Sequence, residues 1–111
     1  MEKCSLILVV KNTGSVFLWR MYYTYITTNH TRNVLYIGMT NNLQRRIGEH
    51  YSNRGNPNTF AGKYFCYKLI YFEMFSTPLK AIHREKEIKK LNRQEKFDLI
   101  KSKNPLLGFL L

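Results

Sequence analysis

Apolar and polar positions repeat along this chain with different periods, and these periods predict its elements. Residues 22–28 and 34–39 are rich in aromatic and β-branched side chains, and the polar residues between them are typical of a turn. We therefore expect a β-hairpin. If residues 29–32 make the turn, Tyr25 lies opposite Tyr36, and the two phenols share one face of the sheet.

A helical pattern follows the hairpin. Apolar side chains at every fourth position predict its buried stripe, which consists of Leu43, Ile47 and Tyr51. Asn41 is the expected N-cap, with Gln44 at the reciprocal position of a capping box. Residues 52–62 are polar and contain glycine and proline, so they predict a loop.

The second half of the chain predicts one strand and two helices. Residues 67–75 form the strand, and Thr77 caps the next helix with Pro78 in its first turn, where a missing N–H costs nothing. A second capping box over residues 92–95 starts another helix, which extends to about Lys103. The order ββαβαα predicts a small α+β domain with a mainly antiparallel three-stranded sheet flanked by helices.

The two ends of the chain differ from its centre. Residues 6–10 and 15–19 are apolar runs separated by polar residues, which suits a hairpin. They suit equally well an appended segment, and both interpretations stay open. We expect residues 1–20 to be an N-terminal extension, residues 21–105 to form the domain, and residues 106–111 to be an apolar tail.

The net charge of the chain limits the kinds of molecule that it is expected to bind. The 111 residues suffice for one domain and include 18 Lys and Arg against 7 Asp and Glu, a net charge of +11. A small domain this basic usually binds nucleic acid, although ribosomal and membrane-surface proteins share the property. Cys4 and Cys66 make no disulfide framework, and free thiols suit the cytoplasm. No apolar stretch reaches the roughly 20 residues that cross a bilayer, so we expect no membrane partner.

Two basic side chains border the buried stripe of the first helix. Arg46 and His50 are four residues apart, so they lie on one side of the helix and can reach a cleft beside the sheet. Arg45 should point to solvent. A purely structural alternative pairs Arg46 with Glu49.

Glu85 is the most informative carboxylate, because its neighbours on the predicted helix are apolar: Ala81, Ile82 and Ile88. A carboxylate on such a face is costly unless it is paired or bound to a cation. The structural alternative is an ion pair with Arg46 or Arg84, and the functional one is a metal ligand. Sparse oxygen ligation suits Mg²⁺, which keeps several waters. Glu87 falls on the polar side of the helix, outside the expected site.

The second half of the chain also carries much of the positive charge. Residues 80–103 contain nine Lys and Arg against four acidic residues, and we expect them to present a phosphate-binding surface. The side chains expected to bind nucleic acid are Lys63, Lys86, Lys89, Lys90 and Arg93.

These motifs carry a resemblance to a known family. Tyr23-Thr24-Tyr25, ten further residues and Tyr36-Ile37-Gly38 resemble the two-part signature of the GIY-YIG endonuclease superfamily. The segments after this signature continue the match, which covers about residues 21–105 and is similar to the small stand-alone bacterial branch. The chain departs from the pattern in its first half-motif, which lacks Gly and Ile, and at Phe97, where many members have Asn.

The resemblance implies a site and a reaction. It assigns catalytic roles to Tyr25, Tyr36, Arg46, His50 and Glu85, with Glu85 holding one Mg²⁺ or Mn²⁺ ion. The implied activity is metal-dependent hydrolysis of phosphodiester bonds, with DNA expected rather than RNA and repair or recombination as the setting. A tyrosine that deprotonates water needs a pKa lowered by nearby cations, since a phenol normally titrates near about 10. The competing hypotheses are a basic nucleic-acid-binding module without catalysis and a structural protein with incidental charge.

Overall fold

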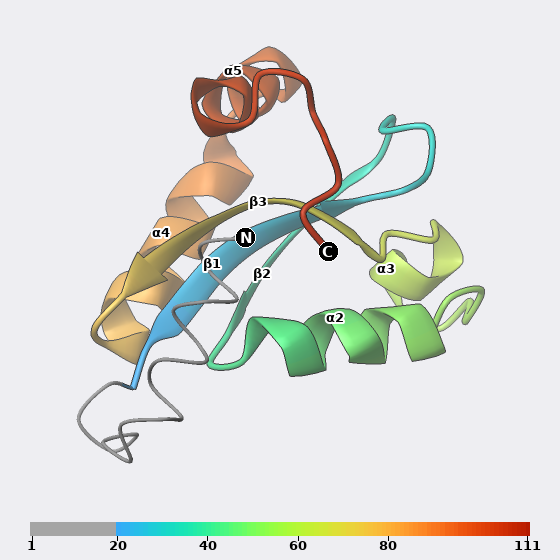
Figure 1. The fold of residues 1–111 in the computed structure, drawn as a ribbon, viewed down its shortest axis with the longest axis horizontal. Coiled ribbons are helices and arrows are strands. Elements are labelled where there is room, and N and C mark those ends of the chain that lie inside the picture. The colour runs from blue at the N-terminus through green and yellow to red at the C-terminus, as the bar shows by residue number, and fades with distance from the viewer. Residues whose placement is uncertain (1–19) are drawn as a thin grey trace.

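The structure, a computed structural model, describes residues 20–111 (Figure 1). Residues 1–19, which the sequence left open between a hairpin and an appended segment, lie outside the described residues, and Cys4 with them. The elements in chain order are β1 (Tyr22–Thr28), β2 (Leu35–Thr40), α2 (Leu43–Ser52), α3 (Phe60–Lys63), β3 (Lys68–Phe75), α4 (Pro78–Lys90) and α5 (Arg93–Lys103).

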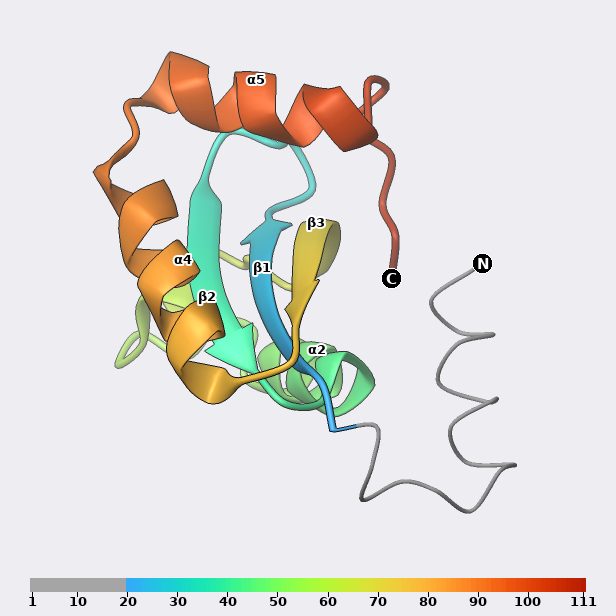
Figure 2. The ribbon, with the colours of Figure 1, turned by 90° about the vertical axis from the view of Figure 1, so that its left-hand side faces the viewer.

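The three strands form one antiparallel sheet in the order β2-β1-β3, which confirms the predicted α+β class. Helix α2 covers one face, and α4 and α5 cover the other (Figures 1 and 2). The buried residues on the α2 side are Tyr23, Tyr25, Leu43, Ile47 and Leu69. Those on the side of α4 and α5 are Ile26, Ile37, Ile70, Tyr71, Ile88 and Ile100. Because strand side chains alternate, β1 contributes to both layers.

The hairpin register differs from the prediction. Tyr25 pairs with Gly38, and Tyr36 pairs with Thr27, so the two tyrosines are not direct cross-strand partners. The connection is longer than four residues because the Asn29 side chain accepts hydrogen bonds from the backbone N–H of Asn33 and Val34. The loop therefore runs over residues 29–34 before pairing resumes. Both tyrosines still lie on the α2 face, since a shift of two residues preserves the face.

Helix α2 begins one residue later than predicted, and its buried stripe is different. Asn42 is the N-cap, with its side chain accepting from the Arg45 N–H at 3.0 Å, whereas the Asn41 side chain accepts from the Arg45 guanidinium. Tyr51, expected in the core, is 49% exposed, and His50 is buried in its place. Positions i, i+4 and i+7 therefore face the sheet, and this turns a polar side chain inward.

The segment predicted as a loop contains a short helix. Thr59 caps α3, with its hydroxyl accepting from the Gly62 N–H at 3.0 Å. The Gly55 N–H donates to the Gly62 carbonyl at 2.8 Å, which fastens the preceding turn to this helix. A side chain at Gly62 would place its Cβ 2.7 Å from the carbonyl oxygens of Asn53 and Asn56. The close approach requires glycine, and the segment forms a fixed unit.

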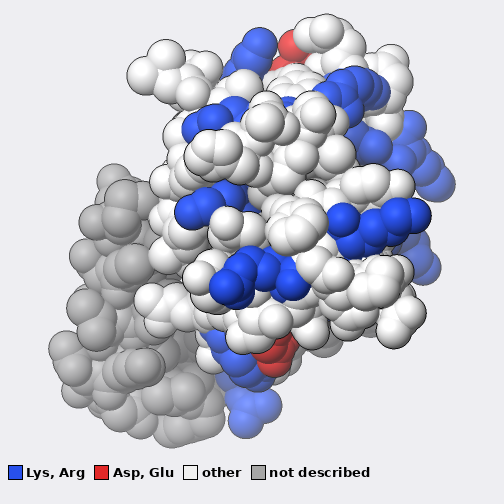
Figure 3. Space-filling view, turned by 90° about the vertical axis from the view of Figure 1, so that its right-hand side faces the viewer, with Lys and Arg blue, Asp and Glu red and all other residues white. Residues whose placement is uncertain are grey.

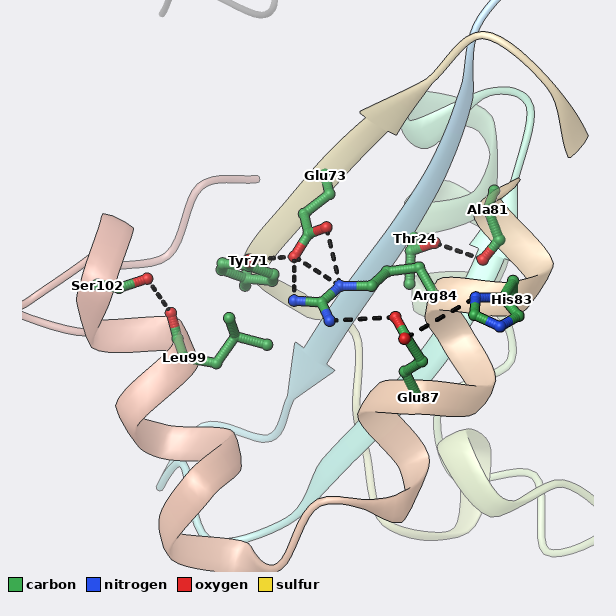
Figure 4. A network of polar contacts seen from close by, with 9 residues as sticks. All are labelled: Thr24, Tyr71, Glu73, Ala81, His83, Arg84, Glu87, Leu99 and Ser102. Carbon is green, nitrogen blue, oxygen red and sulfur yellow. Dashed lines mark hydrogen bonds and ion pairs between the residues drawn. The ribbon is translucent and has the colours of Figure 1, made fainter. Parts of the chain in front are cut away.

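Helices α4 and α5 begin where the sequence predicts. The Thr77 side chain caps α4 with Pro78 in the first turn, and the capping box of α5 is present. Polar contacts join α4 to the sheet: the Thr24 hydroxyl donates to the Ala81 carbonyl at 2.7 Å. The Arg84 guanidinium also binds the Glu73 carboxylate of β3 (Figure 4). These contacts fix the helix that carries Glu85.

The apolar tail lies against the outer edge of β3. The Leu110 N–H donates to the Leu69 carbonyl at 2.7 Å, and the Leu69 N–H donates to the Leu111 carbonyl at 3.2 Å. The Arg32 guanidinium lies 4.0 Å above the Phe109 ring and donates to the Leu107 carbonyl. The tail thus covers a strand edge that would otherwise present unpaired backbone groups. No helix among residues 20–111 has the length and apolarity to cross a membrane.

Candidate active site

Tyr25 lies at the centre of the candidate site. It is fully buried on β1, and its ring crosses the neighbouring strand at Gly38. A Cβ atom at Gly38 would lie 2.5 Å from the Tyr25 hydroxyl. The absence of a side chain at this position is therefore what allows the phenol to reach the edge of the sheet.

Three polar groups meet at the Tyr25 hydroxyl. The oxygen lies 2.8 Å from Nε2 of His50 and accepts a hydrogen bond from Nε of Arg46 at 3.3 Å. Both partners come from α2, one turn apart, as their spacing predicts. The guanidinium can only donate, whereas the phenol and a neutral imidazole can each donate or accept, so the direction of the Tyr25–His50 bond follows the tautomer of the histidine. The result is a connected chain of contacts from Arg46 through Tyr25 to His50.

The titration of these groups fits a hydrogen bond between two neutral partners. Burial raises the pKa of the Tyr25 phenol, and the hydrogen bond from Arg46 only partly offsets the effect. Burial, together with the positive charge of Arg46, lowers the pKa of His50 to about 4. At neutral pH the phenol keeps its proton and the imidazole is uncharged. The surrounding protein groups thus do not give Tyr25 the lowered pKa that a water-deprotonating tyrosine requires.

Tyr36 contacts the same cluster from β2. Its ring meets the His50 ring edge-on, with centroids 5.2 Å apart, and lies 6.3 Å from the Tyr25 ring. The two tyrosines therefore converge despite the changed register. Tyr36 is only partly buried, so it borders solvent where Tyr25 does not.

Arg46 keeps part of its guanidinium at the surface. Its Nη1 lies 3.0 Å from Oε1 of Glu49, so the structural pairing considered from the sequence is present. Partial burial disfavours the charged form, but hydrogen bonds to Glu49 and Tyr25 overcome it and raise the pKa of Arg46. Because Glu49 is half-exposed and lies on the same helix, the contact does not exclude other anions.

Glu85 borders the site from the other side of the sheet. Its side chain is 20% exposed, and its charge adds to the raised pKa of Tyr25, so the two groups lie within electrostatic reach. Neither arginine considered from the sequence pairs with it. Arg84 binds Glu73 and Glu87 instead, and the partner of Glu85 is Nζ of Lys89 at 3.4 Å.

Glu85 fits a sparsely ligated hard cation. Residues 20–111 contain no group of three or more His, Cys, Asp or Glu side chains able to hold a metal ion. A site made wholly of protein ligands, as for structural zinc, is therefore not offered by this part of the chain. A single carboxylate suits Mg²⁺ or Mn²⁺, since such ions keep several waters. The Lys89 ammonium shows that Glu85 accepts a cation, and an i,i+4 pair with a half-exposed lysine is weak.

A hollow of about 410 Å³ lies beside Arg46, lined by Tyr22, Met39, Thr40, Asn41, Arg45, Arg46 and Glu49. Arg45, expected outside the site, therefore lines the same hollow, although its side chain is exposed as predicted. Glu87 lies outside, where it contacts Arg84 and His83.

The side chains expected to bind phosphate, Lys63, Lys86, Lys89, Lys90 and Arg93, are all exposed. Their role stays a prediction, and Lys89 in addition pairs with Glu85. Arg93 lies 5.1 Å from the Phe97 ring centroid. Phe97 packs against the core beneath α5, so the position where many family members carry Asn supplies no polar group to the site.

Sequence reasoning missed two contributions. The first is Gly38, whose only signal was its place in the Tyr-Ile-Gly motif. The second is α3, which brings the Phe60 ring within 6.4 Å of the Tyr36 ring. Thr59, directly before an apolar residue and three positions before Gly62, was an N-cap signal that could have revealed this helix.

Comparisons with known proteins point to one family. Residues 21–98 match a family model described as the GIY-YIG catalytic domain. A UPF0213 protein of Clostridium perfringens is 42% identical over 84 residues, which cover 76% of this chain and 87% of the relative. A UPF0213 protein of Staphylococcus haemolyticus is 37% identical over 82 residues, covering 74% and 96%. The solution NMR structure of a UPF0213 protein from Bacillus halodurans matches with a TM-score of 0.49 at 29% identity, covering 78% of this chain and 88% of that one.

Proposed function

The chain belongs to the GIY-YIG family, whose catalytic domain is a nuclease domain, and on that premise we propose that it is a metal-dependent endonuclease. The observation that carries this proposal is the chain of contacts from Arg46 through Tyr25 to His50, with Tyr36 and Glu85 beside it. A module that only binds phosphates gains nothing from a largely buried carboxylate within electrostatic reach of Tyr25. A hydrolytic site gains from such a carboxylate, because the carboxylate can hold a divalent ion.

Arg46 is the group that stabilises charge on the phosphate. Its guanidinium is planar and permanently protonated, and it is held in place by Tyr25 while remaining partly exposed. A phosphoryl oxygen can replace the half-exposed Glu49 as its partner. Charge that develops on the phosphate in the transition state is then met by a donor already in position, so little reorganisation is needed.

The two tyrosines take different roles. Tyr25 is buried, protonated and engaged on both sides, so we assign it a positioning role for Arg46 and His50. Tyr36 borders solvent and contacts the same imidazole, so its hydroxyl is the one that can hold the attacking water. His50 is neutral and supports both phenols through its ring.

Glu85 would hold the divalent ion, Mg²⁺ or Mn²⁺. Such an ion, when bound, acts as a Lewis acid on the phosphoryl group and stabilises the leaving oxygen. The Thr24 and Arg84 contacts hold α4 on the sheet and so keep this carboxylate within electrostatic reach of Tyr25.

We take DNA as the substrate, repair or recombination as the setting and the cytoplasm as the location, as the resemblance and composition imply. The strongly positive chain supports binding of a polyanion along α4 and α5. Affinity should then fall with salt, with a slope of about −0.9 per phosphate contacted on duplex DNA. The alternative function is a non-catalytic binding module, which would show the same salt dependence.

Cleavage assays separate the two functions. Purified protein is incubated with single-stranded, duplex and branched DNA and the corresponding RNA, in Mg²⁺, Mn²⁺ or chelator. We expect strand cleavage with either metal, none in chelator, and loss of activity in Tyr36→Phe but not in Tyr67→Phe, a second partly buried tyrosine. Equal activity in all three proteins would indicate a contaminating nuclease. Binding without cleavage of any substrate would establish the binding module instead.

A further inference from the structure

Exposed aromatic side chains gather in one segment of the molecule. Seven large hydrophobic side chains of the described residues are exposed, and four of them are aromatic and fall within residues 51–65: Tyr51, Phe60, Tyr64 and Phe65. The other three are scattered aliphatic residues. Each of the four is at least 40% exposed, so they contribute less to the core than their size allows.

Two of these rings continue directly from the candidate site. The Phe60 ring lies 6.4 Å from the Tyr36 ring at an interplanar angle of 28°, and it lies 4.9 Å from the Tyr64 ring. We call Phe60 and Tyr64 the aromatic ledge. It starts at the tyrosine assigned to the attacking water and extends over α3 into solvent.

The ledge stands on a fixed support. Thr59 caps α3, the Gly55 N–H binds the Gly62 carbonyl, and Gly62 admits no side chain. The Cys66 N–H also donates to the Ala61 carbonyl at 2.8 Å. Rings presented on so constrained a turn lose little conformational entropy when they bind a flat ligand.

Positive charge accompanies these rings. Nζ of Lys63 lies 5.4 Å from the Tyr64 ring centroid, and the Arg54 guanidinium lies 3.8 Å above the Tyr51 ring. Figure 3 views the molecule from the side on which α3 lies in Figure 1. Lys and Arg side chains are distributed over this face among uncharged ones, with Asp and Glu only near its margins. Rings interleaved with cations suit a strand that offers both bases and phosphates.

We propose that the aromatic ledge binds unpaired nucleobases by stacking, so that the substrate of the neighbouring site carries a single-stranded segment. Bases inside a duplex cover each other's faces, whereas an unpaired base can stack on an aromatic side chain. The inference rests on the proposed function in taking nucleic acid as the ligand and the Tyr36 site as the place of cleavage. It adds that the nucleic acid carries a single-stranded segment and that the rings of the aromatic ledge select it.

The test compares two strands with equal phosphate charge. One is a fluorescently labelled oligothymidylate, and the other is an equally long strand of abasic units. Binding is measured by anisotropy in chelator, so that no cleavage occurs. We expect the wild type to bind the base-bearing strand about tenfold or more tightly than the abasic one, because stacking on an aromatic ring contributes about 1–3 kcal/mol per base.

Variants locate the effect. Phe60→Ala and Tyr64→Ala should each lose much of the preference for bases while their affinity for the abasic strand stays unchanged. Phe60→Trp should keep the preference for the base-bearing strand. Phe60→Leu, which retains apolar packing but no π face, should behave as Phe60→Ala, and it replaces that variant if the alanine form does not fold. Leu79→Ala removes an even more exposed apolar side chain, on α4, and should have no effect.

Equal affinity of the wild type for both strands would overturn the proposal, as would a loss in Phe60→Leu that affects both strands alike. The two proposals can fail separately. A protein that prefers bases but cuts nothing keeps the ledge and loses the nuclease function. A protein that cuts nucleic acid without preferring bases would support the nuclease function and rule out the role of the ledge.

Discussion

Arg46 and Arg84 each belong to a cluster that contains a glutamate and a tyrosine hydroxyl, but the two clusters are arranged differently. Arg84 on α4 binds both carboxylate oxygens of Glu73 on β3, and that carboxylate also accepts a hydrogen bond from Tyr71 (Figure 4). The Glu73 side chain is 16% exposed. Burial alone would raise the pKa of Glu73, but hydrogen bonds from Arg84 and Tyr71 leave it below its ordinary value. This cluster joins two elements, and both carboxylate oxygens of Glu73 have partners in it.

Arg46 contacts its glutamate through one nitrogen, and Glu49 is 44% exposed on the same helix. Its second contact is a long hydrogen bond to a phenol that already has another partner. We expect such an arginine to exchange its carboxylate for a phosphate at little cost, whereas Arg84 would first have to break its contacts to both oxygens of Glu73. Both clusters contain an arginine, a glutamate and a tyrosine. They differ in how exposed the glutamate is and in whether the contact joins two elements of the fold. We infer that these two differences separate the candidate site from a structural cluster.

The largest effect should come from Arg46→Ala. We expect the single-turnover cleavage rate to fall about 10²–10³-fold, as when a transition-state donor is removed. The free energy of unfolding should change by no more than about 1 kcal/mol, because the pair with Glu49 is exposed. Arg46→Lys keeps the charge but lacks the planar fork, so it should not restore the rate. A wild-type rate in Arg46→Ala would remove the contrast with Arg84.

The opposite outcome is expected for Glu73→Gln. Arg84 would lose its charged partner while remaining partly buried, and we expect a loss of about 1–3 kcal/mol in the free energy of unfolding. Urea denaturation measures this loss. Glu87→Gln removes the exposed partner of the same arginine and should cost no more than about 0.5 kcal/mol. Equal stability of the two variants would show that the Glu73 contact does not fix α4.

Some features of the fold and of these two clusters could be predicted from the sequence, and others could not. Local signals sufficed for the antiparallel hairpin, the caps at Thr77 and Asn92 and the side of α2 that carries Arg46 and His50. The register did not follow, because the Asn29 side chain lengthens the turn through hydrogen bonds that depend on loop geometry. The partner of Glu85 was also missed, since arginines nearer to it in the expected fold are engaged elsewhere.

Burial was harder to predict than secondary structure. Tyr51 was expected in the core and His50 at its border, yet the structure reverses them. The helical period alone allows either His50 or Tyr51 to face the sheet. His50 is the one buried, because the Tyr25 hydroxyl offers it a hydrogen-bond partner there. Helical spacing singled out Arg46, His50 and Glu85, and the resemblance added the catalytic roles expected of them and of the two tyrosines.

Acidification should weaken the region around His50. Its pKa is about 4 in the folded chain against an ordinary 6.5, so the unfolded state binds more protons between these values. Stability contributed by the neutral imidazole is complete above about pH 6.5 and is lost as pH falls towards about 4. Thermal unfolding followed from pH 7 to pH 4 should therefore show a steeper decline for the wild type than for His50→Gln. Parallel declines would place the acid sensitivity elsewhere.

The smallest effect should come from Glu49→Gln. Removing this carboxylate frees Arg45 and Arg46 from an exposed competitor, so affinity for nucleic acid in chelator should rise, by less than about fivefold. The matched control is Glu95→Gln, which neutralises an exposed carboxylate on α5 and should change affinity less. A decrease in Glu49→Gln would mean that Glu49 positions Arg46 and does not compete with phosphate.

The most direct test of the nuclease assignment is the Mg²⁺-dependent cleavage rate of Glu85→Gln, measured beside its nucleic-acid affinity in chelator. The ion pair of Glu85 is with the half-exposed Lys89, so the variant should fold normally. We predict that cleavage is abolished while affinity is equal or slightly higher, since removing a negative charge beside a phosphate cannot weaken attraction. Glu87→Gln, two positions along α4, should cut as the wild type does. Wild-type cleavage by a folded Glu85→Gln would contradict the account.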